Sequence, residues 1–325
     1  MQTSTSFAAH RRLRIHWFAL RIVVTTLGLL TVVLFSSLVV SLLAQERPNP
    51  VKNLPAKIDL QAIKPDLVTP VMQEANPAPG RRVKQQLPDY RETKVYHALY
   101  LPTNWSADRR WPVLVEYPGN GPYSNNLGDT NSGLVEDCNL AYGLSGGEDF
   151  ICLTLPFVNA ETKENQRQWW GDQQATVDYC LAAIDFVCEK YGGDLSRLVL
   201  CGFSRGAIAC NYIGLRDDKI AKLWKCFLVH SHYDGVRRWP YDDSDSESAR
   251  KRLARLNGRA QYITHEGNIA ATEQFLAESE KLAGKPLGKF ALAALPFPNH
   301  TDTWVLRDIE PRRSARAWLR EQLQL

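Results

Sequence analysis

Short apolar runs bounded by turn residues alternate along the chain with stretches of helical periodicity. Before Gly192-Gly193, for example, apolar residues recur at spacings of three and four, as they do on one face of a helix. Strands are predicted over 93–101, 111–117, 150–155, 197–201, 224–230, 260–264 and 290–295, and helices over 177–191, 205–215, 272–282 and from Pro311 onward. This alternation predicts an α/β fold, with a mostly parallel central sheet and helices on both faces.

The beginning of the chain follows a different pattern. Residues 1–21 contain four arginines, and the next 23 residues, 22–44, carry no charge. As a helix, this uncharged stretch would be about 34 Å long, which is enough to cross the hydrocarbon core of a membrane. The arginines favour a cytoplasmic leader and export of the remaining chain. The stretch is therefore either a retained transmembrane anchor or a signal peptide that is cleaved after Ala44.

Residues 45–90 contain eight prolines in polar surroundings and show no sustained helix or strand period. That composition is typical of a semi-extended tether. The expected organisation is a basic cytoplasmic leader over 1–21, an anchor or signal peptide over 22–44, a proline-rich tether over 45–90 and one globular domain over 91–325.

Composition and charge exclude several classes of protein. With 325 residues, 44% of them hydrophobic, the chain can bury a substantial core, so it is not mainly disordered or fibrous. The formal net charge of +4 equals the four leader arginines, so the remaining chain is neutral and we expect no nucleic-acid partner. Seven cysteines cannot all pair, and they lack zinc-ligand spacing. The acidic run at 242–247 lacks the glycine and spacing of a calcium loop, so no metal is predicted.

The motif that carries chemistry is Gly-Phe-Ser-Arg-Gly at 202–206, directly between a predicted strand and a predicted helix. In this context a tight turn exposes the hydroxyl of Ser204 above the sheet, and the flanking glycines let strand and helix approach closely. The backbone N–H of Arg205, at the start of the helix, then points toward a developing oxyanion. We therefore predict that Ser204 is a nucleophile.

A serine nucleophile needs a histidine base that is oriented by a carboxylate. His300 follows the last predicted strand, where the chain order of serine, acid and histidine places the base. Glu266 follows the preceding strand and is the favoured acid, and Asp234, after the strand before that, is the alternative. The remaining histidines beyond these strands, His230, His232 and His265, are expected to be hydrogen-bonding residues of the cleft wall.

Two further segments are candidates for the site. Pro118-Gly119-Asn120-Gly121 follows the strand at 111–117, and the backbone N–H of Asn120 is predicted to be the second oxyanion donor. Trp169 and Trp170 are candidate contacts to a sugar or an aromatic acyl group, although adjacent tryptophans more often pack the start of a helix.

The loop at 119–121, Ser204, Glu266 and His300 occur in this order along the chain. With them the chain resembles the α/β-hydrolase superfamily across residues 90–325. Within it, the chain is similar to exported esterases of the polyhydroxyalkanoate depolymerase, acetylxylan esterase and feruloyl esterase type, and to related predicted peptidases. Pro118 stands where many members have a histidine, and Asn268 stands near where an aspartate is common.

The resemblance implies a serine hydrolase that cleaves carboxylic esters outside the cytoplasm through an acyl-enzyme, without a cofactor. Its expected partners are an ester substrate, with polysaccharide-linked and polyester material as candidates, and a membrane bound through the N-terminal segment. The alternatives are a serine peptidase of the same fold and a catalytically silent domain that binds glycans.

Overall fold

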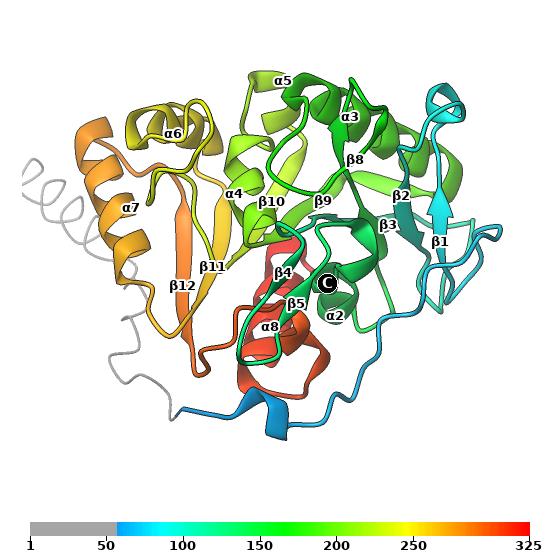
Figure 1. The fold of residues 1–325 in the computed structure, drawn as a ribbon, viewed down its shortest axis with the longest axis horizontal. Coiled ribbons are helices and arrows are strands. Elements are labelled where there is room, and N and C mark those ends of the chain that lie inside the picture. Colours follow the sequence, from blue (N-terminus) through cyan, green and yellow to red (C-terminus); the bar gives the residue numbers. More distant parts are fainter. Residues whose placement is uncertain (1–56) are drawn as a thin grey trace, which may run out of the picture. The chain divides into compact units, whose positions relative to one another are not determined.

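The computed structural model describes residues 57–325 (Figure 1). The predicted leader at 1–21, the uncharged stretch at 22–44 and the first part of the predicted tether lie outside the described residues. Within 57–325, no helix has the length and apolar character needed to cross a membrane.

An eight-stranded sheet forms the centre of the described domain (Figure 1). In spatial order its strands are β1 (Arg82–Gln85), β2 (His97–Tyr100), β6 (Ile151–Thr154), β3 (Trp111–Tyr117), β9 (Gly193–Phe203), β10 (Trp224–His230), β11 (Ala260–Glu266) and β12 (Lys289–Leu295). The pairs β1–β2 and β2–β6 are antiparallel, and every other neighbouring pair is parallel. The predicted α/β class with a mostly parallel sheet is confirmed.

Helices cover both faces of this sheet (Figure 1). The helices α2 (Leu140–Ser145) and α8 (Glu310–Leu323) contribute to the hydrophobic cluster on one face, and α3 (Gln173–Tyr191), α4 (Arg205–Tyr212), α5 (Asp218–Ala221), α6 (Ser246–Leu253) and α7 (Ala270–Ala283) contribute to the cluster on the other. The short elements are the strand pairs β4 (Tyr123–Ser124) with β5 (Thr130–Asn131) and β7 (Phe157–Asn159) with β8 (Glu164–Gln166), and the 3-10 turns η1 (Leu60–Ala62), η2 (Pro88–Tyr90), η3 (Val135–Asp137), η4 (Ala254–Leu256) and η5 (Thr303–Leu306).

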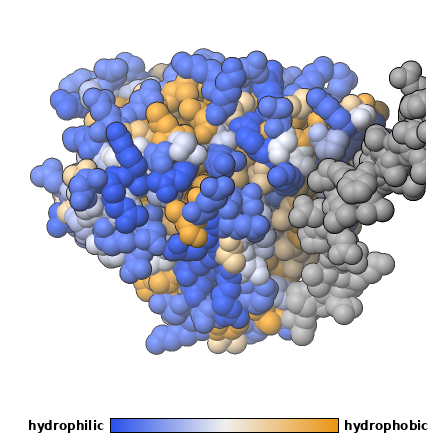
Figure 2. All heavy atoms as spheres, turned by 180° about the vertical axis from the view of Figure 1, so that it is seen from behind, coloured by the Kyte–Doolittle hydropathy of each residue, from blue (hydrophilic) through white to orange (hydrophobic). Residues whose placement is uncertain are grey.

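The two hydrophobic clusters lie on opposite faces of the sheet, because successive side chains of a strand point to opposite faces. In β3, Val113 and Val115 join the cluster of α3 and α4, whereas Leu114 joins that of α2 and α8. All seven residues of β3 are buried, and all but Glu116 are apolar or aromatic, as expected for a strand that is covered on both faces. Figure 2 shows that one face of the molecule is mainly hydrophilic, with hydrophobic residues in small groups.

The domain starts earlier than the sequence predicts, because residues 57–90 pack onto the sheet and do not form a tether. Leu60 is fully buried in the cluster of α2 and α8, and the N–H of Ile58 donates to the carbonyl of Pro296. The guanidinium of Arg82 in β1 is buried and donates to the carbonyls of Val135 and Glu136. These contacts are made with distant parts of the chain, so the local composition of this segment does not reveal them.

The seven cysteines all lie in the described part of the chain, where they are buried and form no disulfide. Burial raises the pKa of Cys152, Cys180 and Cys226 to about 12, so these thiols stay protonated at neutral pH. They act as small buried hydrophobic residues.

Candidate active site

Ser204 lies in the turn between β9 and α4, at the carboxyl end of the central strand. Its backbone has φ 53° and ψ −113°, a region that residues other than glycine rarely adopt. A Cβ atom on Gly202 would lie 2.2 Å from the carbonyl oxygen of Gly206, and one on Gly206 would lie 2.0 Å from that of Tyr117. Both positions therefore require glycine, and the close approach of strand and helix holds Ser204 in its strained conformation.

His300 lies within hydrogen-bonding distance of Ser204, with 3.1 Å between its Nε2 and the Oγ of the serine. The loop that carries it after β12 is held by the buried carboxylate of Asp129, which accepts hydrogen bonds from the backbone N–H of His300 at 3.0 Å and from the side chain of Asn299 at 2.9 Å. The sequence analysis missed Asp129. No local motif marks it, because it reaches the site from the segment before β5.

Glu266 contacts the other nitrogen of the same imidazole, with 2.6 Å between its Oε1 and Nδ1 of His300. The hydroxyl of Ser231, a second residue that the sequence analysis missed, lies 2.8 Å from this nitrogen and 2.9 Å from the same carboxylate oxygen. Burial by itself would raise the pKa of Glu266, but the hydrogen bond from His300 and the neighbouring imidazoles lower it to about 2. The carboxylate therefore stays ionised at neutral pH beside the imidazole.

Asp234, the alternative acid, is placed in a different environment. Its carboxylate is fully buried and forms a two-pronged ion pair with Arg252, with distances of 2.8 Å to Nε and 3.0 Å to Nη2. No hydrogen bond connects Asp234 to His300 in the described structure. The structure thus brings Glu266, and not Asp234, to the imidazole.

His230 and His232 follow one another closely at the end of β10, and neither side chain forms a hydrogen bond with Ser204. The ring of His230 is buried, with Nδ1 3.0 Å from the hydroxyl of Thr264 and Nε2 2.9 Å from the carbonyl of Thr301, so it connects β10, β11 and the His300 loop. Burial lowers the pKa of His230 and of His232 to about 4, which keeps both neutral at pH 7.

The two predicted oxyanion donors are the backbone N–H groups of Arg205 and Asn120. Arg205 is the first residue of α4, so its N–H is not needed by the helix. Asn120 lies three residues beyond Tyr117, which pairs with Gly202 across β3 and β9. The neighbouring N–H of Gly121 donates to the carbonyl of Arg167 at 3.0 Å. In contrast, the N–H of Asn120 has no hydrogen-bond acceptor within residues 57–325.

The two candidate aromatic contacts have different positions. Trp170 is buried and stacks on Tyr212 at a centroid distance of 4.5 Å, so it packs the start of α3 and does not reach a substrate. Trp169 is partly exposed, and its ring lies 5.4 Å from that of Trp239. The ring of His232 in turn lies 5.2 Å from both Trp239 and His300. Trp169, Trp239 and His232 therefore form an aromatic wall that ends at the catalytic candidate His300.

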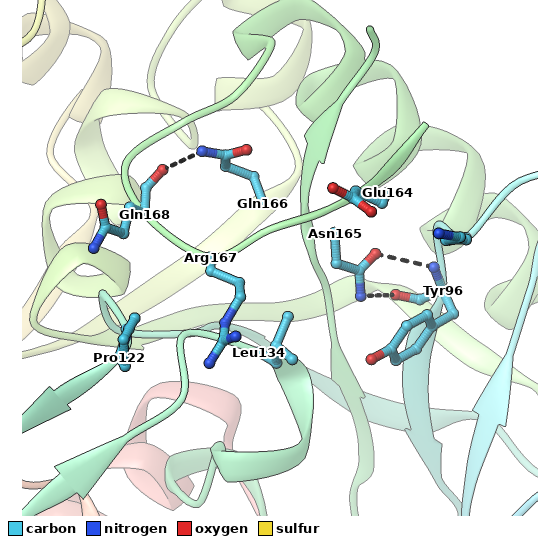
Figure 3. Close-up of a pocket in the computed structure, with 10 residues that line it drawn as sticks. Tyr96, Pro122, Leu134, Glu164, Asn165, Gln166, Arg167 and Gln168 are labelled. Atoms are coloured by element: carbon cyan, nitrogen blue, oxygen red, sulfur yellow. Dashed lines mark hydrogen bonds between the residues drawn. The ribbon is translucent and has the colours of Figure 1, made fainter. Parts of the chain in front are cut away.

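A cavity of about 560 Å³ lies next to the segment that carries Asn120 (Figure 3). Gly121 and Pro122 line it on one side, and the segment 164–168 lines it on the other. Figure 3 shows the side-chain amide of Asn165 facing the backbone of Tyr96, with which it forms two hydrogen bonds of 3.0 and 3.1 Å. Ser204 does not line this cavity, so it is a neighbour of the candidate site and not its centre.

The acidic run at 242–247 has a structural role. Asp245 accepts the N–H groups of Glu247 and Ser248 and thereby caps α6. Within the described part of the chain, no group of three or more His, Cys, Asp or Glu side chains has an arrangement that would hold a metal ion.

Comparison with known proteins gives a likeness in structure only. No protein-family model matches the chain, and no curated protein matches its sequence. Among solved structures, the AtxE2 isopeptidase is similar at TM-score 0.51 and 12% identity over 75% of this chain. One of two esterases from the fungus Rhizomucor miehei is similar at TM-score 0.50 and 10% identity, and a protein assigned as a dipeptidyl aminopeptidase IV from Bacteroides ovatus at TM-score 0.50 and 14% identity, each over 75% of this chain.

The matched proteins differ in size. The match covers 83% of the fungal esterase but only 40% of the isopeptidase and 35% of the peptidase. At such low identity the likeness shows the fold alone. The described chain has the α/β-hydrolase fold that the sequence predicted.

Proposed function

We propose that this protein is a serine hydrolase in which Ser204, His300 and Glu266 act as nucleophile, base and orienting acid. The observation that carries the proposal is the continuous chain of contacts from the strained turn at Ser204 through both nitrogens of His300 to Glu266. A catalytically silent domain would have no need for a strained serine beside an oriented imidazole.

The geometry supports a two-step acyl transfer. As Oγ of Ser204 attacks the carbonyl carbon, its proton moves to Nε2 of His300, and Glu266 stabilises the imidazolium that forms. The N–H groups of Arg205 and Asn120 stabilise the oxyanion. When the carbon–oxygen bond of the ester breaks, His300 gives the proton to the leaving alcohol. Water then loses a proton to His300 and attacks the acyl carbon. The bond from this carbon to Oγ of Ser204 breaks, His300 returns the proton to Oγ, and the acid is released.

We propose carboxylic esters as the substrates, with a flat apolar or sugar ring next to the reacting carbonyl. The aromatic wall of Trp169, Trp239 and His232 supports this, since aromatic faces stack on such rings. A serine peptidase of the same fold is the alternative, and cleavage of an anilide at a rate comparable to that of the matched ester would favour it.

The test is labelling by a fluorophosphonate probe together with turnover of a small aryl ester and its matched anilide. Wild-type protein should be labelled and should cleave the ester faster than the anilide. Ser204→Ala and His300→Ala should each reduce ester turnover by about a thousandfold or more, with unchanged circular dichroism. A folded Ser204→Ala protein that retains a rate within about tenfold of wild type would show that Ser204 is not the nucleophile.

We also propose that the domain acts outside the cytoplasm, which is supported by the arginine-rich leader and the 23 uncharged residues that follow it. A reporter enzyme that works only after export should be active when it is fused after Leu325. Activity of a cytoplasm-dependent reporter at the same position would refute export. Recovery of an exported product with a new N-terminus near Gln45 would identify the uncharged stretch as a cleaved signal peptide.

A further inference from the structure

Arg205 follows the candidate nucleophile directly, and its side chain is fully buried. The guanidinium donates to four backbone carbonyls, those of Pro118 at 3.4 Å, Gly133 at 3.0 Å, Gln166 at 3.4 Å and Trp169 at 2.7 Å. None of the salt bridges formed by residues 57–325 includes Arg205. It is therefore a buried cation that is paired with backbone carbonyls and has no acidic side chain as a partner.

These carbonyls belong to two segments, 118–133 and 166–169, and the first of them carries Asn120. Pro118 comes two residues before Asn120, and Trp169 is held directly by Asn120, whose Oδ1 accepts the N–H of Trp169 at 2.8 Å. The guanidinium also lies over the ring of Phe157, with 4.1 Å from its central carbon to the ring centroid. A single side chain thus connects the start of α4 to both neighbouring segments.

Burying this charge has a cost that packing alone does not explain. A cation transferred from water into a protein interior is strongly destabilised unless it is hydrogen bonded, and an apolar side chain of similar length would fill the same space without that penalty. Burial lowers the pKa of Arg205 to about 9, so the side chain is still charged at neutral pH. The charge and the planar set of donors are therefore the features that a function must use.

We propose that the side chain of Arg205 is a positioning residue of the oxyanion hole, which holds the backbone N–H of Asn120 in a fixed geometry relative to the backbone N–H of Arg205 itself. The inference rests on the proposed serine hydrolase function. Because both the clamp and the first oxyanion donor belong to one residue, movement of the 118–133 segment relative to Ser204 is restricted. The positive charge of Arg205, which no carboxylate neutralises, also favours the negative charge that develops on the substrate oxygen.

The test compares wild type, Arg205→Met and Arg205→Lys in the full chain. Arg205→Met keeps the length of the side chain but removes the donors and the charge, and it should lower kcat for an aryl ester by about 100-fold while KM changes by less than about threefold. The affinity for an aryl boronic acid, which forms a tetrahedral anion on the serine, should fall by a similar factor. Arg205→Lys keeps the charge but lacks the planar set of N–H donors, and it should lower kcat by only about tenfold.

Arg259→Met is the matched control. Arg259, like Arg205, donates to backbone carbonyls, among them those of Leu256 at 2.7 Å and Trp224 at 3.1 Å, and burial lowers its pKa. It lies at the amino end of β11, whereas Ser204 follows the carboxyl end of β9. Arg259→Met should reduce thermal stability and leave kcat per active site within about twofold of wild type.

Burst titration with a chromogenic ester gives the number of active sites, so that kcat refers to folded enzyme only. The inference is overturned if Arg205→Met retains kcat per site within about threefold, or if its loss in kcat is matched by an equal loss in Arg259→Met. If Arg205→Met does not fold, Arg205→Lys takes its place: a decrease of about tenfold in its kcat supports the inference, and an unchanged kcat overturns it. A wild-type protein that neither reacts with fluorophosphonate nor cleaves esters would refute the proposed function, whereas an active wild type with an unchanged Arg205→Met refutes this inference alone.

Discussion

The carboxyl ends of β10 and β11 each carry a carboxylate, and the two carboxylates have different partners. Asp234, after β10, forms an ion pair with Arg252, a buried residue of α6. Glu266, at the end of β11, contacts His300, which in turn contacts Ser204. Both side chains were reasonable acids by chain order. The comparison shows that the partner decides the role: a permanent cation makes a structural pair, whereas an imidazole gives a pair that can accept and return a proton.

The largest effect in this comparison is expected for substitution of Glu266, which should reduce the rate of catalysis. Glu266→Gln keeps the size of the side chain but cannot stabilise the imidazolium, so kcat for an aryl ester should fall by about a thousandfold or more. Steady-state kinetics with burst titration measures the change. A larger loss of kcat in Asp234→Asn than in Glu266→Gln would reverse the assignment of the acid.

The corresponding change on the other side of the comparison should affect stability. Asp234→Asn leaves the guanidinium of Arg252 buried without a counter-ion, and the free energy of unfolding should fall by about 3 kcal/mol. Urea titration gives this value, and kcat per active site should stay within about threefold of wild type. As a control, the double variant Asp234→Leu/Arg252→Met should recover part of the lost stability, because both charges are then removed.

The pH dependence of stability provides a third test. The pKa of Glu266 is lowered from 4.5 to about 2 in the folded state, so its ionised form stabilises the fold above about pH 4.5, and that contribution is lost as the pH falls toward 2. The difference in unfolding free energy between wild type and Glu266→Gln should therefore be present at pH 6 and shrink between pH 4.5 and 2. A difference that is independent of pH over this range would contradict the pairing with His300.

The smallest effect is expected at Ser231, whose hydroxyl contacts both His300 and Glu266. Ser231→Ala should lower kcat about fivefold, as expected for one hydrogen bond of about 1 kcal/mol that helps to orient the pair. Parallel kinetics of Ser231→Ala and Glu266→Gln would measure both. An equal loss in the two variants would mean that the hydroxyl, and not the carboxylate, controls the imidazole.

Much of the fold is encoded locally. The predicted strands at 111–117 and 224–230 have the same bounds as β3 and β10, because strands that are buried on both faces are short and mainly apolar. The strand β1 was not predicted. Its four residues, Arg-Val-Lys-Gln, are mainly polar and follow a proline-rich stretch, and only pairing with β2 makes them a strand.

For the candidate site, the sequence by itself determined Ser204 and the two glycines around it, because the turn between strand and helix leaves no room for other residues there. Chain order also indicated His300 and gave two candidates for the acid. Only the tertiary structure decided that Glu266 contacts the imidazole, that Asp234 is held by Arg252, that Trp170 is buried, and that Asp129 and Ser231 belong to the site. The physical reason is that these contacts join residues far apart in the chain, and their distances are set by the register of the strands and the packing of the loops beyond them.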